Sequence, residues 1–155
     1  MFPDNKPSTI FPKLEIFNPS GHTLPFNSRH VSKLIRSIEL KEKVRFSDLE
    51  IVFTDEEEII KINSQYLDKD YVTDIISFRY DEGSADKAIE GTLYCCASRI
   101  EEQSREFDTD PEEEFLRIIV HGALHLAGYD DQTEQDKENM RNLENFYLTK
   151  VIGRN

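Results

Sequence analysis

The sequence predicts an α+β fold in which one mixed sheet of about four strands packs against several helices. The first observation is the order of patterns. Segments with the two-residue period of strands alternate with helical patterns through the first two thirds of the chain, and only helical patterns follow. The second is size and composition, because 155 residues with 37% hydrophobic content suit one folded domain with a heavily charged surface. We therefore expect a single domain over residues 1–155.

The first half of the chain contains two strand–helix pairs. They follow an N-terminal arm, residues 1–12, in which three prolines and several polar residues are compatible with a flexible segment. A strand is expected over 13–19 and a helix over 27–43, where an Asn/Ser cap precedes apolar residues at helical spacing. A second strand over 47–53 leads into a helix over 54–67. The first residue of that helix, a threonine, is expected to cap it ahead of an acidic first turn.

The second half adds two strands and then only helices. A third strand over 73–80 and a fourth over 89–98 flank a polar loop. A short helix over 97–107 precedes a longer one over 110–128, which opens with Asp-Pro and three glutamates and is stopped by a glycine. The last helix, 133–152, is expected to place one apolar stripe against the core, made of Met140, Leu143, Phe146, Tyr147 and Val151.

Charge and hydropathy limit the partners. The formal net charge of −12 argues against broad electrostatic capture of nucleic acid, and no DNA partner is expected. A local basic groove or a metal-mediated phosphate contact stays open. No apolar run approaches the ~18 residues of a membrane span, and the N-terminus lacks the pattern of a secretory signal. We therefore expect a cytoplasmic protein with no membrane partner, and unpaired thiols at the adjacent Cys95 and Cys96.

The segment HGALHLAGYDD, residues 121–131, carries the chemistry of the chain. His121 and His125 are one helical turn apart, so both imidazoles project from the same face, as two ligands of one metal ion do. Gly128 ends the helix, and the chain that turns back there can return Asp131 to that face. The bland alternative is that the two histidines merely share a face and are satisfied by hydrogen bonds. The spacing and the paired acids favour a metal site at the C-terminal end of this core helix.

The same spacing occurs in zinc proteases whose third ligand follows a glycine turn. Those enzymes place a glutamate directly after the first histidine, where it activates water. Here that position is Gly122. The missing glutamate argues against peptide hydrolysis.

At this point the sequence resembles the YbeY-type single-strand-specific endoribonucleases of bacterial rRNA maturation. The motif of that family, H-G-x-L-H-L-x-G-Y-D-H, matches HGALHLAGYDD through Asp130. The strand motif G-D-I is similar to GTL at 91–93. A second block, L-N-x-x-Y-R-x-K-D-x-P-T-D-V-L-S-F, looks like INSQYLDKDYVTDIISF at 62–78, with Asn63, Tyr66, Lys69, Asp70, Thr73, Asp74, Ser77 and Phe78 in register.

The resemblance spans about residues 47–149. It implies an α+β fold with the metal helix packed on a mixed sheet, and one divalent ion, usually taken as zinc, held at the three motif positions beside a groove. The implied substrate is RNA, notably the 3′ end of small-subunit ribosomal RNA. The implied partners are the ribosome and small-subunit maturation factors.

The sequence departs from the family pattern at positions that touch this chemistry. The third histidine is Asp131, and the arginine thought to meet RNA phosphate is Leu67. Leucine cannot contact phosphate, so either another cation substitutes or RNA binding is weaker. Arg79, directly after the matched SF, is the expected substitute, and the alternative is a solvated arginine at a strand end. The remaining departures, Val72 for proline and Thr92 for aspartate, lie outside the expected metal site.

Asp131 in place of an imidazole lowers the charge of a divalent site from +2 to +1. Two histidines and a carboxylate suit zinc, and also Fe(II), Mn or Ni. Asp130 is the rival ligand, and if Asp131 binds the ion, Asp130 is expected to orient a histidine. Thr73 and Asp74 are candidates for the substrate groove, although a turn cap and a backbone contact are equally open to them. No general base is identified.

The leading hypothesis from the sequence is a metal-dependent endoribonuclease that hydrolyses phosphodiesters during rRNA processing and ribosome biogenesis. Two alternatives stay open. One is a ribosome-associated or metal-binding accessory protein with weak or no hydrolase activity, which Leu67 and the acidic surface favour. The other is a small-molecule metallohydrolase.

Overall fold

The structure is a computed structural model that describes residues 13–81 and 88–153. The expected arm at 1–12 and most of the polar loop before the fourth strand lie outside the described residues. Within them, all nine expected elements are present, four strands and five helices. None of the described helices is long and apolar enough to cross a membrane.

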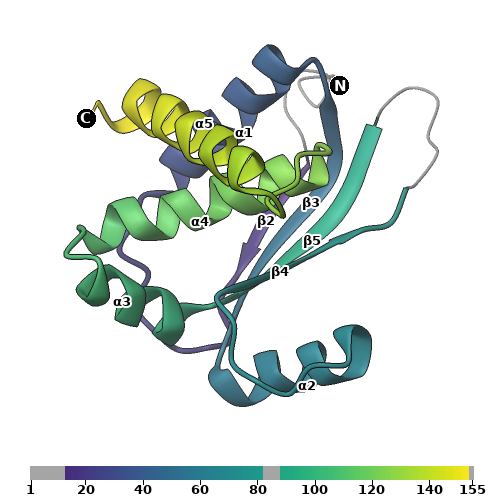
Figure 1. Cartoon of the computed structure of the whole chain (residues 1–155), viewed down its shortest axis with the longest axis vertical. Coiled ribbons are helices and arrows are strands. Elements are labelled where there is room, and N and C mark those ends of the chain that lie inside the picture. Colours follow the sequence, from purple (N-terminus) through teal and green to yellow (C-terminus); the bar gives the residue numbers. More distant parts are fainter. Residues whose placement is uncertain (1–12, 82–87, 154–155) are drawn as a thin grey trace, which may run out of the picture.

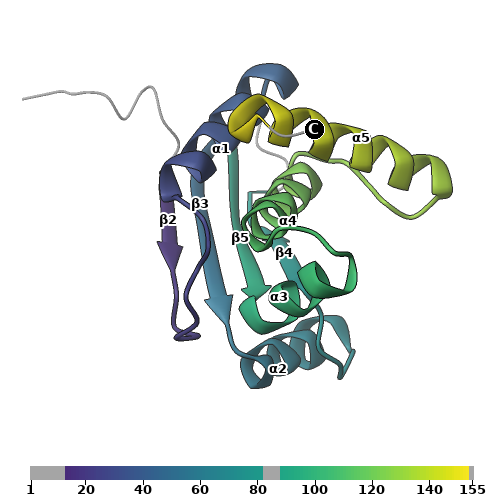
Figure 2. The same ribbon diagram turned by 90° about the vertical axis from the view of Figure 1, so that its left-hand side faces the viewer.

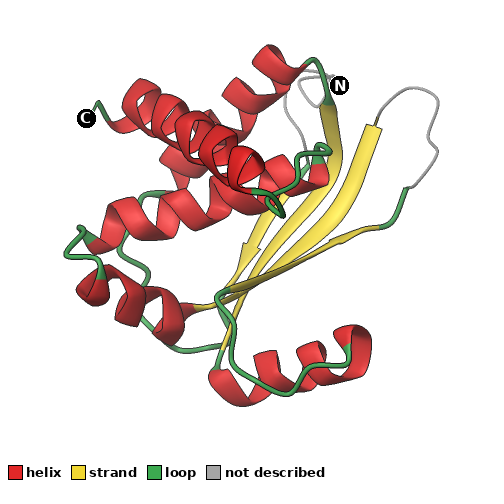
Figure 3. Ribbon diagram, viewed as in Figure 1, coloured by secondary structure: helices red, strands yellow, loops and turns green. Residues whose placement is uncertain are grey.

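The strands form one mixed sheet, which confirms the predicted fold class (Figures 1 and 3). Its order is β2 (Leu14–Phe17), β3 (Arg45–Thr54), β5 (Ala88–Cys96) and β4 (Ile75–Arg79). β2 pairs with β3 and β3 with β5 in parallel, and β4 runs antiparallel to β5 at one edge. The two parallel pairs require crossovers, and helices supply them.

Four helices lie together, with α4 (Pro111–Leu126) packed against β4 and β5 (Figure 2). α3 (Ala97–Glu106), α1 (Ser28–Glu42) and α5 (Glu134–Ile152) pack against α4. α2 (Glu56–Leu67) lies apart from them, at the end of the sheet where β3 finishes and β4 begins, and packs on β5 (Figures 1 and 2). The α4 helix therefore sits between the sheet and α5, where its side chains form the centre of the core.

Two glycines bring α4 close to the sheet. A Cβ atom at Gly122 would lie 2.6 Å from Ile75 Cδ1 and 2.9 Å from Leu93 Cδ2. A Cβ atom at Gly91 on β5 would lie 2.8 Å from Leu126 Cδ1 at the end of α4. Real Cβ atoms do not approach neighbours this closely, so only glycine fits at these positions without a shift. The close contact fixes α4, and with it the histidines on its other side.

The adjacent cysteines form no disulfide, as predicted, and both are fully buried. Cys95 belongs to the main core and Cys96 to a smaller cluster with residues of α2, so the two thiols point to opposite faces of the sheet.

Two sequence predictions are wrong in detail. Thr54 does not cap α2 but ends β3, where its hydroxyl is 3.4 Å from the Cys95 carbonyl, and Asp55 caps the helix instead. Phe146 is not on the buried stripe of α5, because its side chain is 44% exposed. Glu144 takes an inward position on this helix, next to the core.

Candidate metal centre

The site is built on the last two turns of α4 and on the chain that follows them. His121 and His125 lie one turn apart on α4, with their rings in contact. The helix ends at Leu126, and Gly128 then takes a backbone φ of 111°, a conformation that favours glycine. The chain reverses there and brings Asp131 back to both histidines, as the motif predicts. His121 Nε2 lies 3.3 Å and His125 Nε2 3.5 Å from the same oxygen, Asp131 Oδ2.

The three atoms form a triangle whose size suits one metal ion. Its third side is the 3.1 Å distance between the Nε2 atoms of His121 and His125. Bonds of about 2.0–2.1 Å to a tetrahedral zinc place adjacent ligand atoms about 3.3 Å apart. Among residues 13–81 and 88–153 the cluster contains these three ligands alone, so a tetrahedral ion held by them would have a fourth position for water or substrate, as in catalytic rather than structural zinc sites. His121, His125 and Asp131 are each partly exposed, so an ion and a substrate can both reach them.

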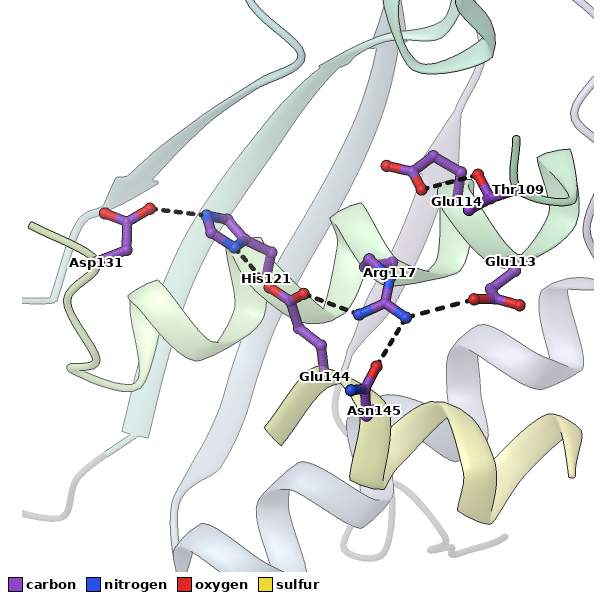
Figure 4. Close-up of polar contacts among 8 residues, drawn as sticks. All are labelled: Thr109, Glu113, Glu114, Arg117, His121, Asp131, Glu144 and Asn145. Atoms are coloured by element: carbon purple, nitrogen blue, oxygen red, sulfur yellow. Dashed lines mark hydrogen bonds and ion pairs between the residues drawn. The ribbon is translucent and has the colours of Figure 1, made fainter. Parts of the chain in front are cut away.

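Glu144 orients His121 from the neighbouring helix. Its Oε2 lies 2.8 Å from His121 Nδ1, and the residue is only 7% exposed (Figure 4). Because a carboxylate accepts hydrogen bonds, the Nδ1 atom carries the hydrogen and donates it, which leaves the Nε2 lone pair of His121 facing Asp131 and His125. This carboxylate–histidine pair is the arrangement that fixes the tautomer of metal-binding imidazoles.

Arg117 holds Glu144 in turn. One turn before His121 on α4, its Nη1 donates to Glu144 Oε1 at 3.1 Å, and its Nη2 lies 2.9 Å from Asn145 Oδ1 and 3.3 Å from Glu113 Oε2 (Figure 4). The guanidinium thus joins α4 to α5 and offsets the charge of the buried glutamate. The site consequently includes a supporting layer that spans two helices.

The electrostatics of His121 reflect this surrounding. Burial acts to lower the pKa of His121, but the hydrogen bond from its ring to Glu144 and the negative charges of Glu144, Asp131 and Asp74 outweigh it and raise the pKa above its usual value. The same negative charges attract a cation to the imidazole, and a divalent metal ion is one cation that the Nε2 atom can bind.

A cavity of about 310 Å³ opens beside the triangle, and we call it the site cavity. His121 and Asp131 form part of its wall. Four carboxylate residues line it, namely Asp74, Glu114, Asp131 and Glu144. Three cationic residues also line it, namely Arg117, Lys137 and Arg141. The space therefore combines candidate metal ligands with positive groups, which a phosphodiester requires.

Of the other predicted site residues, some lie at the site cavity and some lie away from it. Asp74 lines the site cavity, in the loop just before β4, and Thr73 lies beside it with its hydroxyl 3.5 Å from Asp74 Oδ1. Asp130 is exposed and is not part of the three-ligand cluster. Leu67 ends α2, with its side chain 44% exposed, and does not line the site cavity.

Arg79, at the end of β4, does not line the site cavity either. Its Nε and Nη2 atoms each lie 3.0 Å from the Asp81 carboxylate, and its Nη1 donates to the Leu126 carbonyl at 3.0 Å. The hydrogen bond from Arg79 lowers the pKa of Asp81. Arg79 therefore links the C-terminal end of α4 to β4. Its positive charge there also complements the negative end of the helix dipole.

Glu144 and Arg117 were not predicted as site residues from the sequence. Each lies on a predicted helix, but the contacts of Glu144 with His121 and with Arg117 join residues that are 23 and 27 positions apart. A signal for Glu144 existed in its position, because it is four residues after Met140 and three before Tyr147, both buried on α5. A charged residue in such a stripe indicates a buried partner.

Comparisons with known proteins identify the family of the chain. Residues 22–152 match the model of the family described as Endoribonuclease YbeY. A relative named Endoribonuclease YbeY from Chlorobium phaeobacteroides is 35% identical over 138 residues, which cover 89% of this chain and 96% of the relative. One of the same name from Bacteroides fragilis is 33% identical over 133 residues, 85% of this chain and 94% of that protein.

A solved structure is also similar. The solution structure of TM1509 from Thermotoga maritima aligns with a TM-score of 0.57 and 28% identity, over 90% of this chain and 89% of that one. The family match covers the metal helix and three of the four strands of the sheet, β3, β4 and β5. The chain belongs to the Endoribonuclease YbeY family.

Proposed function

We propose that this protein is a metal-dependent endoribonuclease that cleaves single-stranded RNA in the cytoplasm. The curated relatives carry the name Endoribonuclease. We assign it to rRNA processing, at the 3′ end of small-subunit ribosomal RNA, and thereby to ribosome biogenesis. Its partners are then RNA and the ribosome or small-subunit maturation factors. The whole chain acts as a single metallo-endoribonuclease domain.

One observation carries the proposal: the triangle of His121, His125 and Asp131 opens on a cavity that also contains cations. A metal site alone would suit many hydrolases. A metal site beside positive side chains suits a substrate whose reacting group is a phosphodiester. The open fourth position suits catalysis rather than support of the fold.

The three residues fit one divalent ion, and zinc is our first assignment. Fe(II), Mn and Ni accept the same two imidazoles and a carboxylate. When bound, such an ion polarises a phosphoryl oxygen and makes water a better nucleophile at neutral pH. The carboxylate lowers the net charge of the site below that of three imidazoles, which weakens both effects.

The side chains of this chain have separate tasks. Glu144 holds the imidazole of His121 in the tautomer that leaves Nε2 free, and Arg117 holds Glu144. Asp74 lies in the same cavity and is positioned to accept a hydrogen bond from water or from a ribose hydroxyl. No residue is assigned as the general base.

Cleavage of single-stranded RNA tests the function. The purified protein should cut a single-stranded RNA and leave a duplex of the same sequence intact, and a chelator or His121→Ala should abolish cutting. Activity that survives both treatments would exclude the metal mechanism and indicate a contaminating nuclease. Hydrolysis of small phosphodiesters without cleavage of RNA would indicate a small-molecule metallohydrolase.

The accessory-protein alternative has one observation in its favour. Leu67 replaces the family's arginine and leaves an apolar side chain exposed at the end of α2. Absence of cleavage with any divalent ion, together with co-sedimentation with small ribosomal subunits, would favour a ribosome-associated protein without hydrolase activity.

A further inference from the structure

The positions at which the sequence leads one to look for a phosphate contact do not provide one. Leu67 has no charge, and Arg79 is bound to Asp81 and to the end of α4. Arg117, although it lines the site cavity, is bound to Glu144, Glu113 and Asn145. None of these three positions offers a cation that can turn to a substrate without breaking the contacts that hold the site.

The first two turns of α5 offer two other cations. Lys137 and Arg141 are four residues apart on this helix, so they are neighbours on one face, with Cβ atoms about 5–6 Å apart. Both line the site cavity together with His121 and Asp131. Glu144, three residues after Arg141, is the residue that holds His121, so the same helix carries the cations and the support of the metal ligand.

These cations have little to hold them within the protein. Arg141 is exposed and makes no hydrogen bond or ion pair with any residue of 13–81 or 88–153. Lys137 has one ion pair, 3.8 Å from Glu134, and these side chains are 54% and 95% exposed. Exposed pairs of this kind contribute little to stability, so a phosphate can replace the carboxylate at low cost.

Three of the four carboxylate residues of the site cavity have other partners, and Asp74 is the fourth. The Glu144 carboxylate forms an ion pair with Arg117 and a hydrogen bond with His121. Burial raises the pKa of Glu114, whose carboxylate lies 3.3 Å from the hydroxyl of Thr109 (Figure 4). The charge of Asp131 faces the two histidines, where a metal ion would take it up.

We propose that Lys137 and Arg141 form the phosphate-binding subsite of this protein and hold the backbone of single-stranded RNA beside the metal centre. The proposal rests on the endoribonuclease function and specifies it for this chain. Two cations on one helix take over the phosphate contact of the single arginine that the family motif has at the position of Leu67. They neutralise backbone phosphates next to the bond that is cut, and they do not read the base sequence.

RNA binding tests the subsite independently of cleavage. The probe is a fluorescein-labelled single-stranded RNA. Its anisotropy is measured with a chelator present, so that the proposed metal-dependent cleavage does not occur while the Kd is determined. Lys137→Gln/Arg141→Gln should weaken binding about tenfold at about 0.15 M salt, where the Debye length is about 8 Å. The slope of log K against log salt should become shallower by about 1.4, because each lost phosphate contact removes about 0.7 for a single strand.

A matched double variant controls for overall charge. Arg29→Gln on α1 and Lys61→Gln on α2 remove the same two charges from exposed positions that do not line the site cavity. This variant should bind the probe within about twofold of the parent protein, because distant exposed charges are screened by salt. Lys137→Arg/Arg141→Lys keeps both charges and should restore most of the affinity.

The outcomes separate the two proposals. If Lys137→Gln/Arg141→Gln binds the probe like the parent protein, or if the control variant loses as much affinity, the subsite is wrong even when the parent protein cleaves RNA. If binding depends on Lys137 and Arg141 but no RNA is cut with any divalent ion, the subsite stands and the endoribonuclease function fails.

Discussion

At Asp131 a carboxylate stands where the family motif has a third imidazole, and the structure brings it to both histidines. Its Oδ2 atom is 3.3 Å from one Nε2 atom and 3.5 Å from the other, so the replacement keeps the three-ligand geometry. What changes is charge, from +2 to +1 for a divalent site. Glu144 adds a further negative charge on the far side of His121. At the scale of single residues, the groups around the ion therefore carry more negative charge than three imidazoles would.

The choice of third ligand can be tested by metal content. Asp131→Ala should lose most of the bound ion, and Asp131→His should retain it, because an imidazole restores the third donor. Asp130→Ala is the matched control and should keep its metal, since Asp130 is exposed and outside the cluster. The number of metal ions per chain, measured by mass spectrometry after gel filtration, shows whether Asp131 or Asp130 is the third ligand. Normal metal content in Asp131→Ala would show that the ligand assignment is wrong.

Glu144 should affect the metal without touching it. Glu144→Gln keeps the shape of the side chain but removes the charge that fixes the tautomer of His121, so zinc affinity should fall about tenfold or more. Competition with a chromogenic chelator measures this affinity. Glu113→Gln is the control, because Glu113 contacts Arg117 but not the histidine. An unchanged zinc affinity in Glu144→Gln would leave the glutamate with a purely structural role.

At the scale of elements, the sequence could predict what is local. Caps, periodicity and the glycine stop place α4 and α5 within one or two residues. The motif spacing also leads one to expect His121, His125 and Asp131 close together, and the structure brings their ligand atoms together. The contact of His121 with Glu144 could not be predicted, because it depends on how α5 crosses α4. The burial of Phe146 was predicted wrongly for the same reason, since several faces of an amphipathic helix contain apolar residues.

At Gly122, the close packing of α4 on the sheet disfavours the glutamate that a zinc protease has at this position. The sequence marks it as the position where zinc proteases have a glutamate, and the structure shows that any Cβ atom there would force the side chains of Ile75 and Leu93 to shift. Gly122→Ala should lower the free energy of unfolding by about 1–3 kcal/mol through overpacking against β4 and β5. Urea denaturation of the purified variant measures this loss.

Ile75→Val provides the matching control, because it deletes the Cδ1 atom that would lie 2.6 Å from the methyl carbon of an alanine at position 122. In a double-mutant cycle, Gly122→Ala should cost less in the Ile75→Val background than in the parent protein. Equal costs in the two backgrounds would mean that the contact with Ile75 does not limit how closely α4 approaches the sheet.

At the scale of the whole molecule, the core and the metal centre are separate. The largest fully buried side chains are apolar or aromatic and come from helices and strands that hold no metal ligand, except α4 itself. The three ligands belong to one helix and the turn after it, so an ion there does not join distant parts of the fold. This differs from structural zinc sites, in which the metal organises the chain.

Metal removal should therefore leave the protein folded but less stable. Zinc at 100 times its Kd stabilises the native state by about 2.7 kcal/mol if it does not bind the unfolded chain. For a domain of this size, that corresponds to a fall in Tm of roughly 5–10 °C when a chelator removes the ion. Circular dichroism should show an unchanged helical spectrum at room temperature, and His121→Ala should show no zinc-dependent shift in Tm. Loss of the helical spectrum on chelation would instead mean that the ion holds the fold together, and the open fourth position could then no longer be taken as a mark of catalysis.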